Sequence, residues 1–489
     1  MGIVEDTKAM FDATTMTPAQ IVAGLIEEFK SSLAYKDMVQ GKAYYDNDND
    51  IRRRVIYRYE NDVKVPDDDA TNNRISHPFM KNAVDEKVSY LLGNPVTFNT
   101  DEEGEEQPLQ EIVNRVLDED FDDALIDYAR EASNGGIAWL HGFIDTDEAG
   151  EPILQWEPIE CDQVIPLWSD AAHRKLEAIV RFYYVEEYVG EEKKLVMRAE
   201  LWDRMTVQHF IEYDGALVED VEKNPDGPVG HYAKVEGETS EEYGWGIVPF
   251  IPLRNNSKER PDLRSVKPIV DAYDKVVSNN DNMLEEVQAF VYVLKNYPGT
   301  SLTEFVTNLR RYRAIKVDED GGVDKVQADL TPEAVEAHLD RLKSDFYQFG
   351  QSVDMGIDKM GAAPSGVALE FLYSGLKLKA SDLERKLRRS LKQVLYMVGQ
   401  FLEITGQGKY DMSRVDITFT RSTITNSLET AQTLVELDAT HSRRTVLANS
   451  PYVDDVEEEL GYIDEEGSVD SLSFNFEPGD NTDSRVDDE

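Results

Sequence analysis

A glycine pair with the spacing of a phosphate-binding loop occurs in MGAAPSGVALEF, residues 360–371. Gly361 and Gly366 are separated as in the loop whose backbone N–H groups cradle phosphates, whose Lys reaches the β and γ oxygens, and whose Ser or Thr binds Mg²⁺. Here Val367 and Ala368 follow the second glycine, and neither carries charge or a metal ligand. The spacing is present without the chemistry, so we do not predict an ATPase.

Side chains of the types that catalyse reactions or bind metals form no recognisable pattern. The histidines are scattered, and none has a second His four residues away, the spacing that binds zinc on a helix. Asp46, Asp48 and Asp50 resemble the start of a calcium loop, but the positions that require Gly and Glu hold Ile51 and Tyr57. We therefore predict no catalytic residue, no cofactor and no metal, and a solvated turn at these aspartates.

The composition is that of an acidic globular protein. The 489 residues include 97 Asp and Glu against 51 Lys and Arg, which gives a net charge of -46. Most of such a surface repels nucleic acid and anionic membranes, although solubility alone would also explain the charge. The single cysteine, Cys161, leaves no intrachain disulfide and fits a reducing cytoplasm. No apolar run approaches the ~20 residues that span a bilayer, so no membrane segment is predicted.

Hydrophobic periodicity divides the chain into helices, then a sheet, then helices again. Helices are expected at 17–40, 77–98, 108–133, 262–295, 301–312, 331–351, 365–406, 426–438 and 443–461. Short strand patterns separated by turn residues fill 137–253, and two further strands are expected on either side of 320–322. The capping-box spacing of Ser381 and Glu384 predicts a kink or break in the long helix near Gly375 to Ser381.

Five stretches follow one another along the chain in a characteristic order. They are NNRISHPFMKNAVDEKVSYLLGNPVTF, EASNGGIAWLHGFIDTDEAGEPILQWEPIECDQVIPLW, DLRSVKPIVDAYDKVVSNNDNMLE, MGAAPSGVALEFLYSGLKLKASDLERKLRRSLKQ and THSRRTVLANSPYVDDVEEEL. In this order they resemble the portal proteins of tailed bacteriophages, in particular the siphophage portals of Gram-positive hosts. The resemblance covers residues 40–461, and it lies in the series of stretches rather than in any single motif.

The resemblance implies an α+β portal fold, with a mixed helix and sheet wing, a long helical stem, a small α/β clip and a helical crown, assembling into a ring. The implied regions are an N-terminal arm and wing (1–261), a first stem helix (262–295), the clip (296–330), a second stem helix (331–352), a tunnel loop with the start of the long helix (353–374), the long helix and crown (375–466) and an acidic disordered tail (467–489). Two helices that flank a compact insertion agree with a stem that carries a clip.

The resemblance also implies a function without enzymatic activity. Portal rings, commonly of twelve copies, form the DNA channel at one capsid vertex, through which the terminase motor packages the genome and the genome is later ejected. The implied partners are double-stranded DNA without sequence specificity, terminase, a head-completion or adaptor protein, the scaffold and the major capsid protein, with no membrane. The implied location is the virion, and the host cytoplasm during assembly. Two alternatives stay open: a nucleotide-driven packaging enzyme of the terminase type, which the missing Lys and Ser or Thr argue against, and a prophage-derived structural protein.

The same resemblance gives the opening segment another role, as a tunnel loop at the narrowest part of the channel. The loop consists of Met360, Gly361, Ala362, Ala363, Pro364, Ser365 and Gly366. Gly and Pro oppose helix, and Ser365 can cap the helix that follows. From residue types alone, an ordinary interhelical loop is the alternative. Portals often carry a Lys after the Ala-Leu pair, where this chain has Glu370, which weakens any argument that tunnel lysines grip DNA.

A local excess of positive charge follows the loop. It consists of Lys377, Lys379, Arg385, Lys386, Arg388, Arg389 and Lys392. In a ring of chains that each carry a net charge of -46, we expect these residues to pair with acidic surfaces of neighbouring subunits, with a solvated helix face as the alternative. An acidic channel wall would repel DNA phosphates and let the duplex slide.

Overall fold

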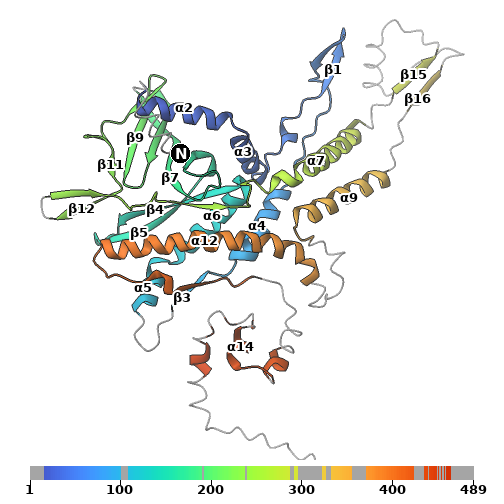
Figure 1. Cartoon of the computed structure of the whole chain (residues 1–489). Coiled ribbons are helices and arrows are strands. Elements are labelled where there is room, and N and C mark those ends of the chain that lie inside the picture. Colours follow the sequence, from blue (N-terminus) through green and yellow to red (C-terminus); the bar gives the residue numbers. More distant parts are fainter. Residues whose placement is uncertain are drawn as a thin grey trace, which may run out of the picture. The chain divides into compact units, whose positions relative to one another are not determined.

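The computed structural model describes most of the chain in two compact units. The described residues are 16–100, 108–189, 192–236, 239–286, 291–295, 322–326, 332–354, 370–422, 434–438, 440–448, 450, 453, 456 and 459–463. The units are Met1–Met355 with Tyr373–Ser422, and Gly356–Leu372 with Thr423–Glu489. The first unit contains the sheets and the long helices, and the second contains the short helix α14 (Arg443–Ala448) (Figure 1).

Capping residues determine where the first helices begin and end. These helices are α2 (Pro18–Ser31), α3 (Leu33–Tyr45), α4 (Phe79–Leu92), α5 (Pro108–Val116) and α6 (Glu119–Gly135). Thr17 and Gln20 form a capping box at the start of α2, and the Ser32 side chain accepts a hydrogen bond at the start of α3. The single helix expected over 17–40 is therefore two helices. The helix expected over 108–133 is also two, because Asp118 caps α6 separately.

Antiparallel sheets fill the stretch in which short strands were expected, which confirms that expectation. The strands are β4 (Ile137–Thr146), β5 (Pro152–Ile159), β6 (Val164–Trp168), β7 (Leu176–Val189), β8 (Glu192–Trp202), β9 (Thr206–Tyr213), β10 (Ala216–Glu219), β11 (Val229–Gly230), β12 (Tyr232–Glu236), β13 (Thr239–Tyr243) and β14 (Phe250–Arg254). One six-stranded sheet has the order β10-β9-β8-β7-β6, with β11 beside β9. A three-stranded sheet has the order β14-β4-β5, and β12 pairs with β13. Helix α2 packs on the six-stranded sheet through Val22 and Ile26, which share a cluster with Phe182 and Phe210.

The long helix α12 (Ser374–Ile404) lies at the centre of the largest hydrophobic core. Apolar residues recur three or four positions apart along it and form a buried stripe, of which every member is at most 3% exposed: Leu383, Leu387, Leu391, Leu395, Val398 and Leu402. The helix runs without interruption past Gly375 and Ser381, so the break expected there is wrong. The Ser381 hydroxyl accepts a hydrogen bond from Arg421 instead of capping a new helix. Along the same core, β3 (Thr97–Thr100) pairs with β17 (Val415–Thr418).

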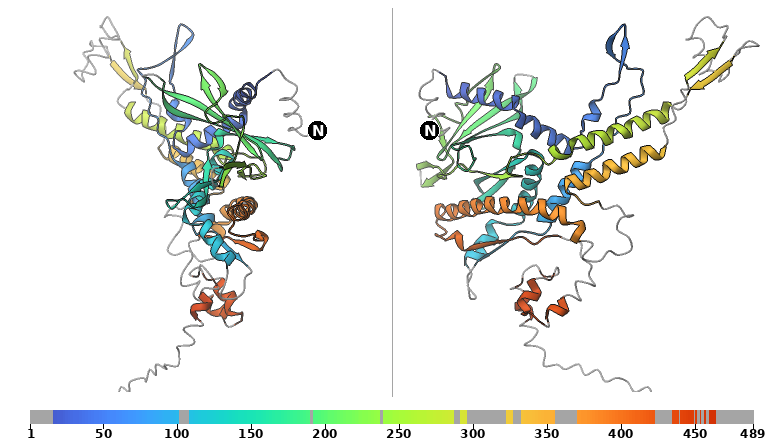
Figure 2. Two further views of the ribbon diagram at one scale, coloured as in Figure 1. Left: turned by 90° about the vertical axis from the view of Figure 1, so that its left-hand side faces the viewer. Right: turned by 45° about the vertical axis from the view of Figure 1, so that its right-hand side comes forward.

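Two helices, α7 (Leu263–Glu286) and α9 (Pro332–Gly350), run side by side (Figures 1 and 2). The helix expected over 331–351 is confirmed by α9. The helix expected over 262–295 is wrong in its last part, since α7 ends at Glu286 and β15 (Val291–Lys295) follows. A short run of β-branched and aromatic residues suits a strand as well as a helix, and periodicity alone cannot decide between them.

Strand β15 pairs with β16 (Gly322–Val326), so that Lys295 lies opposite Gly322. The strand after 320–322 was expected to pair with the residues just before that turn, whereas the partner that the described residues supply lies before 296. The expected helix at 301–312, the tunnel loop and the acidic tail lie outside the described residues. The region boundaries that the resemblance implies stay predictions.

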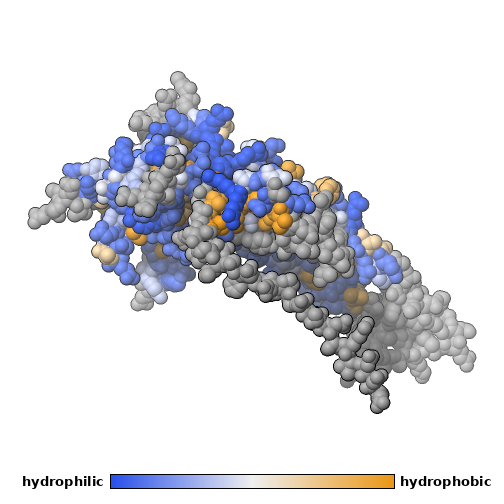
Figure 3. All heavy atoms as spheres, turned by 90° about the horizontal axis from the view of Figure 1, so that it is seen from below, coloured by the Kyte–Doolittle hydropathy of each residue, from blue (hydrophilic) through white to orange (hydrophobic). Residues whose placement is uncertain are grey.

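The smaller elements complete the described fold. A hairpin of β1 (Tyr57–Glu60) and β2 (Val63–Pro66) pairs with no other strand of the described chain, and three short turns of 3-10 helix are η1 (Asp50–Arg53), η2 (Cys161–Gln163) and η3 (Met412–Arg414). The face seen from below is mainly hydrophilic, with small apolar areas (Figure 3). Among the described helices, none is long and apolar enough to cross a membrane.

Candidate channel and subunit-contact site

The tunnel-loop residues Met360–Gly366 lie outside the described residues, but the two ends of the segment that contains them are fixed. The Lys379 amino group, on α12, donates to the Gly350 carbonyl at the end of α9 over 3.1 Å. The Glu86 carboxylate, on α4, accepts a hydrogen bond from the Val353 backbone N–H at 3.1 Å. The chain therefore leaves α9 and enters α12 at neighbouring places.

A buried ionic cluster lies at this junction, between α4, α7 and α12. Asp262 directly precedes α7. Its carboxylate accepts a hydrogen bond from the Lys87 amino group at 2.7 Å and lies 3.1 Å from the Lys379 amino group. The Lys87 side chain is 1% exposed, and its amino group also donates to Asn255 at 2.9 Å. Burial lowers the pKa of Lys87 to about 8. Burial alone would raise the pKa of Asp262, but Lys379 and Lys87 outweigh it and hold that pKa well below its usual range.

Three further predicted contact residues pair within their own chain. Lys386 and Arg385 both reach the Asp382 carboxylate, at 2.6 and 3.3 Å. Arg388 contacts Glu384 at 3.5 Å and donates to the Ile417 carbonyl of β17. Together with Lys379, these residues stabilise the subunit itself. Their predicted contact with a neighbour stays a prediction.

The other members of the basic cluster face outward. Lys377, Arg389 and Lys392 are exposed on α12, and within the described residues Arg389 and Lys392 have no ion-pair partner. Because residues three and four apart share a helix face, Lys386, Arg389 and Lys392 lie along one side of α12. Arg389 and Lys392 are therefore the members of the cluster that are both exposed and without an ion pair in the part of the chain that the structure describes.

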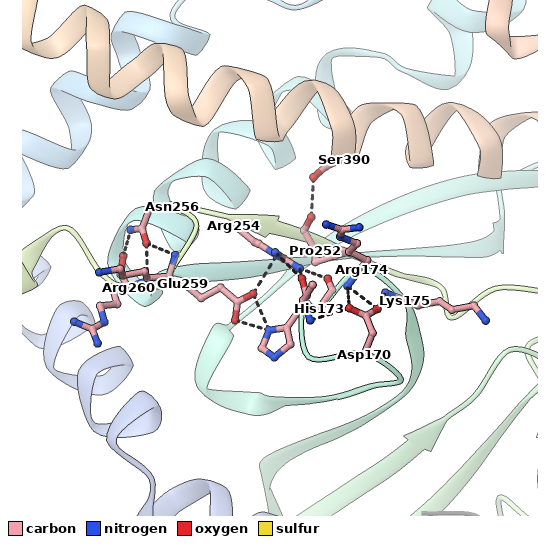
Figure 4. Close-up of polar contacts among 12 residues, drawn as sticks. Asp170, His173, Arg174, Lys175, Pro252, Arg254, Asn256, Glu259, Arg260 and Ser390 are labelled. Atoms are coloured by element: carbon pink, nitrogen blue, oxygen red, sulfur yellow. Dashed lines mark hydrogen bonds and ion pairs between the residues drawn. The ribbon is translucent and has the colours of Figure 1, made fainter. Parts of the chain in front are cut away.

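That side of α12 forms one wall of a groove of about 810 Å³, and the opposite wall comes from β14 and the loop before β7. The walls meet where the Ser390 hydroxyl donates to the Pro252 carbonyl at 2.7 Å (Figure 4). Glu259 fixes the opposite wall, because its carboxylate lies 3.0 Å from both Arg254 and His173 (Figure 4).

The groove is lined by basic residues from four separate segments. They are Arg174, Lys175, Arg204, Arg254, Lys386, Arg389 and Lys392, and no Asp or Glu joins them in the lining. Apolar residues that include Val248 and Phe250 form part of the lining, with Trp168 beside them. The sequence analysis missed the first four of these cations, because they are scattered through an acidic chain and only the fold brings them together.

The side chains that could bind a metal ion already have another partner, either a cation or a bound proton. Within the described residues, Glu131, Cys161 and Asp162 are the group close enough to share an ion, but the Lys42 amino group already lies 2.7 Å from Asp162. Burial raises the pKa of the Cys161 thiol, which keeps it protonated and a poor metal ligand. In the aspartate run, Asp50 lies 2.6 Å from Lys267. A metal site is not supported at either place.

Comparisons with known proteins agree with the series of stretches in the sequence. Residues 30–471 match the family model described as phage portal protein, SPP1 Gp6-like. The portal protein of Bacillus phage SPP1 is 35% identical over 468 residues, which cover 95% of this chain and 88% of that protein. The portal protein of Clostridium phage phiCD119 is 32% identical over 449 residues, 88% of this chain and 92% of that protein. The chain belongs to the SPP1 Gp6-like family of phage portal proteins.

Proposed function

We propose that copies of this chain form a closed ring, commonly of twelve, that serves as the DNA channel at one vertex of a phage capsid. The observation that carries the proposal is the match to portal proteins over nearly the whole chain, at 35% identity across 95% of it. The paired helices α7 and α9, with the β15–β16 pair beyond them, support the assignment of a stem and clip.

The charge of the chain suits the passage of DNA. A protein that neutralises many phosphates with Lys and Arg binds the duplex tightly and holds it in place. A chain with a net charge of -46 makes few such contacts, so a duplex inside the ring meets an acidic wall and slides. The expected contact with DNA has no sequence specificity.

The tunnel loop, Met360–Gly366, is proposed as the segment that faces the duplex. The hydrogen bond between Lys379 and the Gly350 carbonyl supports this, because it brings the two described ends of the segment close together. Its small residues suit a narrow passage.

In vitro packaging with purified rings tests the loop proposal. Gly361→Trp adds a large side chain in every copy and should reduce the amount of nuclease-protected DNA without preventing ring assembly. Gly366→Pro should impair packaging through the backbone where the following helix begins. Gly24→Trp, on the exposed side of α2, is a matched control, because nothing lies within 4 Å of a Cβ built there and its backbone is not in the left-handed region. Normal packaging by Gly361→Trp rings would remove the loop from the channel.

The remaining assignments follow from the same proposal. The ring acts without enzymatic activity of its own, and the terminase, docked on residues 296–330, supplies the nucleotide hydrolysis. A head-completion or adaptor protein, the scaffold and the major capsid protein are further partners, the ring reaches the virion from the host cytoplasm, and no membrane is involved. An ATPase assay of the isolated chain tests whether the ring lacks enzymatic activity. ATP hydrolysis by the wild type that Gly366→Pro abolishes would show that the chain is an enzyme.

A further inference from the structure

We infer that the basic groove between α12 and β14 receives a carboxylate-bearing segment of a second copy of this chain. The inference rests on the proposed ring and identifies the place where one subunit holds the next. The sequence prediction concerned the basic residues of one helix, whereas half of the lining of this groove comes from the sheet and its loops.

The first observation is the charge that the groove leaves unneutralised. Lys175 and Arg204 share Glu177, at 3.5 and 2.6 Å, and Arg254 has Glu259. Arg174, Arg389 and Lys392 have no ion pair within the described residues. Three unpaired cations in one hollow repel each other, and an anionic partner relieves that repulsion.

The second observation is a rigid aromatic wall beside these cations. Trp168 lines the groove and is 5% exposed, yet no described atom accepts from its indole Nε1. The Arg254 guanidinium covers the ring face at 5.6 Å and the His173 ring stacks on it at 5.2 Å, so the indole is fixed in place. The Nε1 atom is itself buried from solvent, so it does not define the bound group, and the fixed indole supplies a rigid wall beside the cations. A carboxylate is the anion that those cations lack.

The third observation is that the same chain supplies the complementary surface. At the start of α6, none of five carboxylates has an ion-pair partner among the described residues: Asp118, Glu119, Asp120, Asp122 and Asp123. A ring requires two different patches on each subunit that fit each other, because its contacts are head-to-tail. A groove with unpaired cations and acidic segments with unpaired carboxylates on one chain satisfy that requirement by charge.

A zero-length carbodiimide cross-link tests the contact, because it joins an amine to a carboxylate only when they touch. Rings are assembled from equal amounts of ordinary and ¹⁵N-labelled wild-type chain, cross-linked and digested for mass spectrometry. Lys392 is the informative amine, since Lys386 and Lys175 already have carboxylates of their own chain beside them. We expect peptide pairs that join Lys392 of one isotope to an Asp or Glu of the other. Cross-links at Lys392 within one chain only, or none, would overturn the inference.

Charge reversal tests whether the contact matters for assembly. The Arg389→Glu, Lys392→Glu double variant should raise the protein concentration needed for half-assembly by about tenfold. Lys36→Glu with Lys223→Glu is the matched control, because both side chains are exposed, lie outside the groove and have no ion pair within the described residues, and the net charge changes equally. Equal assembly of the two double variants would overturn the inference while leaving the ring intact. If the wild type forms no rings, the proposed function itself fails, and the inference fails with it.

Discussion

Helices α12 and α7 both present a stripe of buried residues spaced four apart, but the stripe of α7 changes from apolar to polar along the helix. On α12 the stripe includes Leu383, Leu387 and Leu391, all 0% exposed. On α7 it begins with Val266 and Val270, at 1%, and continues with three polar side chains: Asp274 and Ser278, at 0%, and Asn282, at 7%. Apolar burial holds α12 along its length, whereas the polar part of the α7 stripe accepts hydrogen bonds from the chain beside it.

The partners of the α7 stripe are backbone groups of a single extended segment. Asn73, Ile75 and His77 donate their N–H groups to Asn282, Ser278 and Asp274, at 2.7, 3.0 and 3.1 Å. Apolar contacts are non-directional and tolerate small shifts, whereas each of these bonds requires one geometry and water can replace it. We therefore expect α12 to hold the unit together, and the segment at 73–77 to detach from α7 without unfolding it.

The largest loss of stability is expected from a substitution in the buried ionic cluster, where the two helices meet. Asp262→Ala leaves the amino groups of Lys87 and Lys379 buried without a counter-ion, and should lower the free energy of unfolding by about 3–5 kcal/mol. Urea unfolding followed by tryptophan fluorescence measures the loss. Asp345→Ala is the matched control, because it breaks only the exposed pair with Arg341. A loss below that of the control would mean that water already solvates the cluster.

A smaller loss of stability, which affects the whole unit, is expected from a substitution in the apolar stripe. Leu391→Ala creates a cavity in the core and should lower the free energy of unfolding by about 2–5 kcal/mol, without dependence on salt. Leu378→Ala removes the same atoms from a side chain of the same helix that is 69% exposed, and should cost little. Equal losses in the two variants would contradict the central position given to α12.

The polar stripe should respond locally. Asp274→Ala removes the acceptor of the His77 backbone N–H, the His77 ring and the Asn49 amide, at 3.1, 2.7 and 2.6 Å. Hydrogen exchange at 73–77 should accelerate by about 10- to 100-fold while α12 keeps its protection. Lys275→Ala, on the exposed side of α7, is the control. Acceleration throughout the unit would mean that the segment does not detach independently.

Acid should weaken the β14-β4-β5 sheet through a buried histidine rather than through either stripe. His141 donates from Nδ1 to the Pro249 carbonyl at 2.9 Å, and burial lowers its pKa to about 4. An unfolded His has a pKa of about 6.5, so below that pH the unfolded chain binds the extra proton first. This contribution to stability is complete above about pH 6.5 and is lost as the pH falls to about 4. Unfolding midpoints at several pH values should therefore decline less in His141→Phe, and an unchanged decline would exclude His141 as the cause.

The smallest effect, on ring assembly, is expected from removal of the acidic tail, which is part of neither α7 nor α12. Removal of residues 467–489 should leave ring assembly unchanged, because so few apolar residues cannot offset the entropy of ordering the segment. Size-exclusion chromatography of the truncated chain measures this. A truncated chain that stays monomeric would make the tail part of the subunit contact.

The contrast between the stripes also explains what the sequence could predict. The leucines of α12 repeat at helical spacing, so their burial could be predicted, whereas on α7 polar side chains such as Asp274 are buried and Leu284 is 65% exposed, which apolar spacing does not predict. The contact of Lys87 with Asp262, and the groove that Arg389 and Arg174 both line, join distant parts of the chain, and no local pattern encodes them. The strand β15 was missed because the apolar run that contains it fits both periodicities.

Electron microscopy of the purified wild-type chain tests the central claim most directly. We expect rings with an axial hole, wide enough for a DNA duplex, formed without DNA or any other protein. Particles that remain monomeric, or that form closed assemblies without an axial hole, at concentrations and salt that keep the chain folded would contradict it.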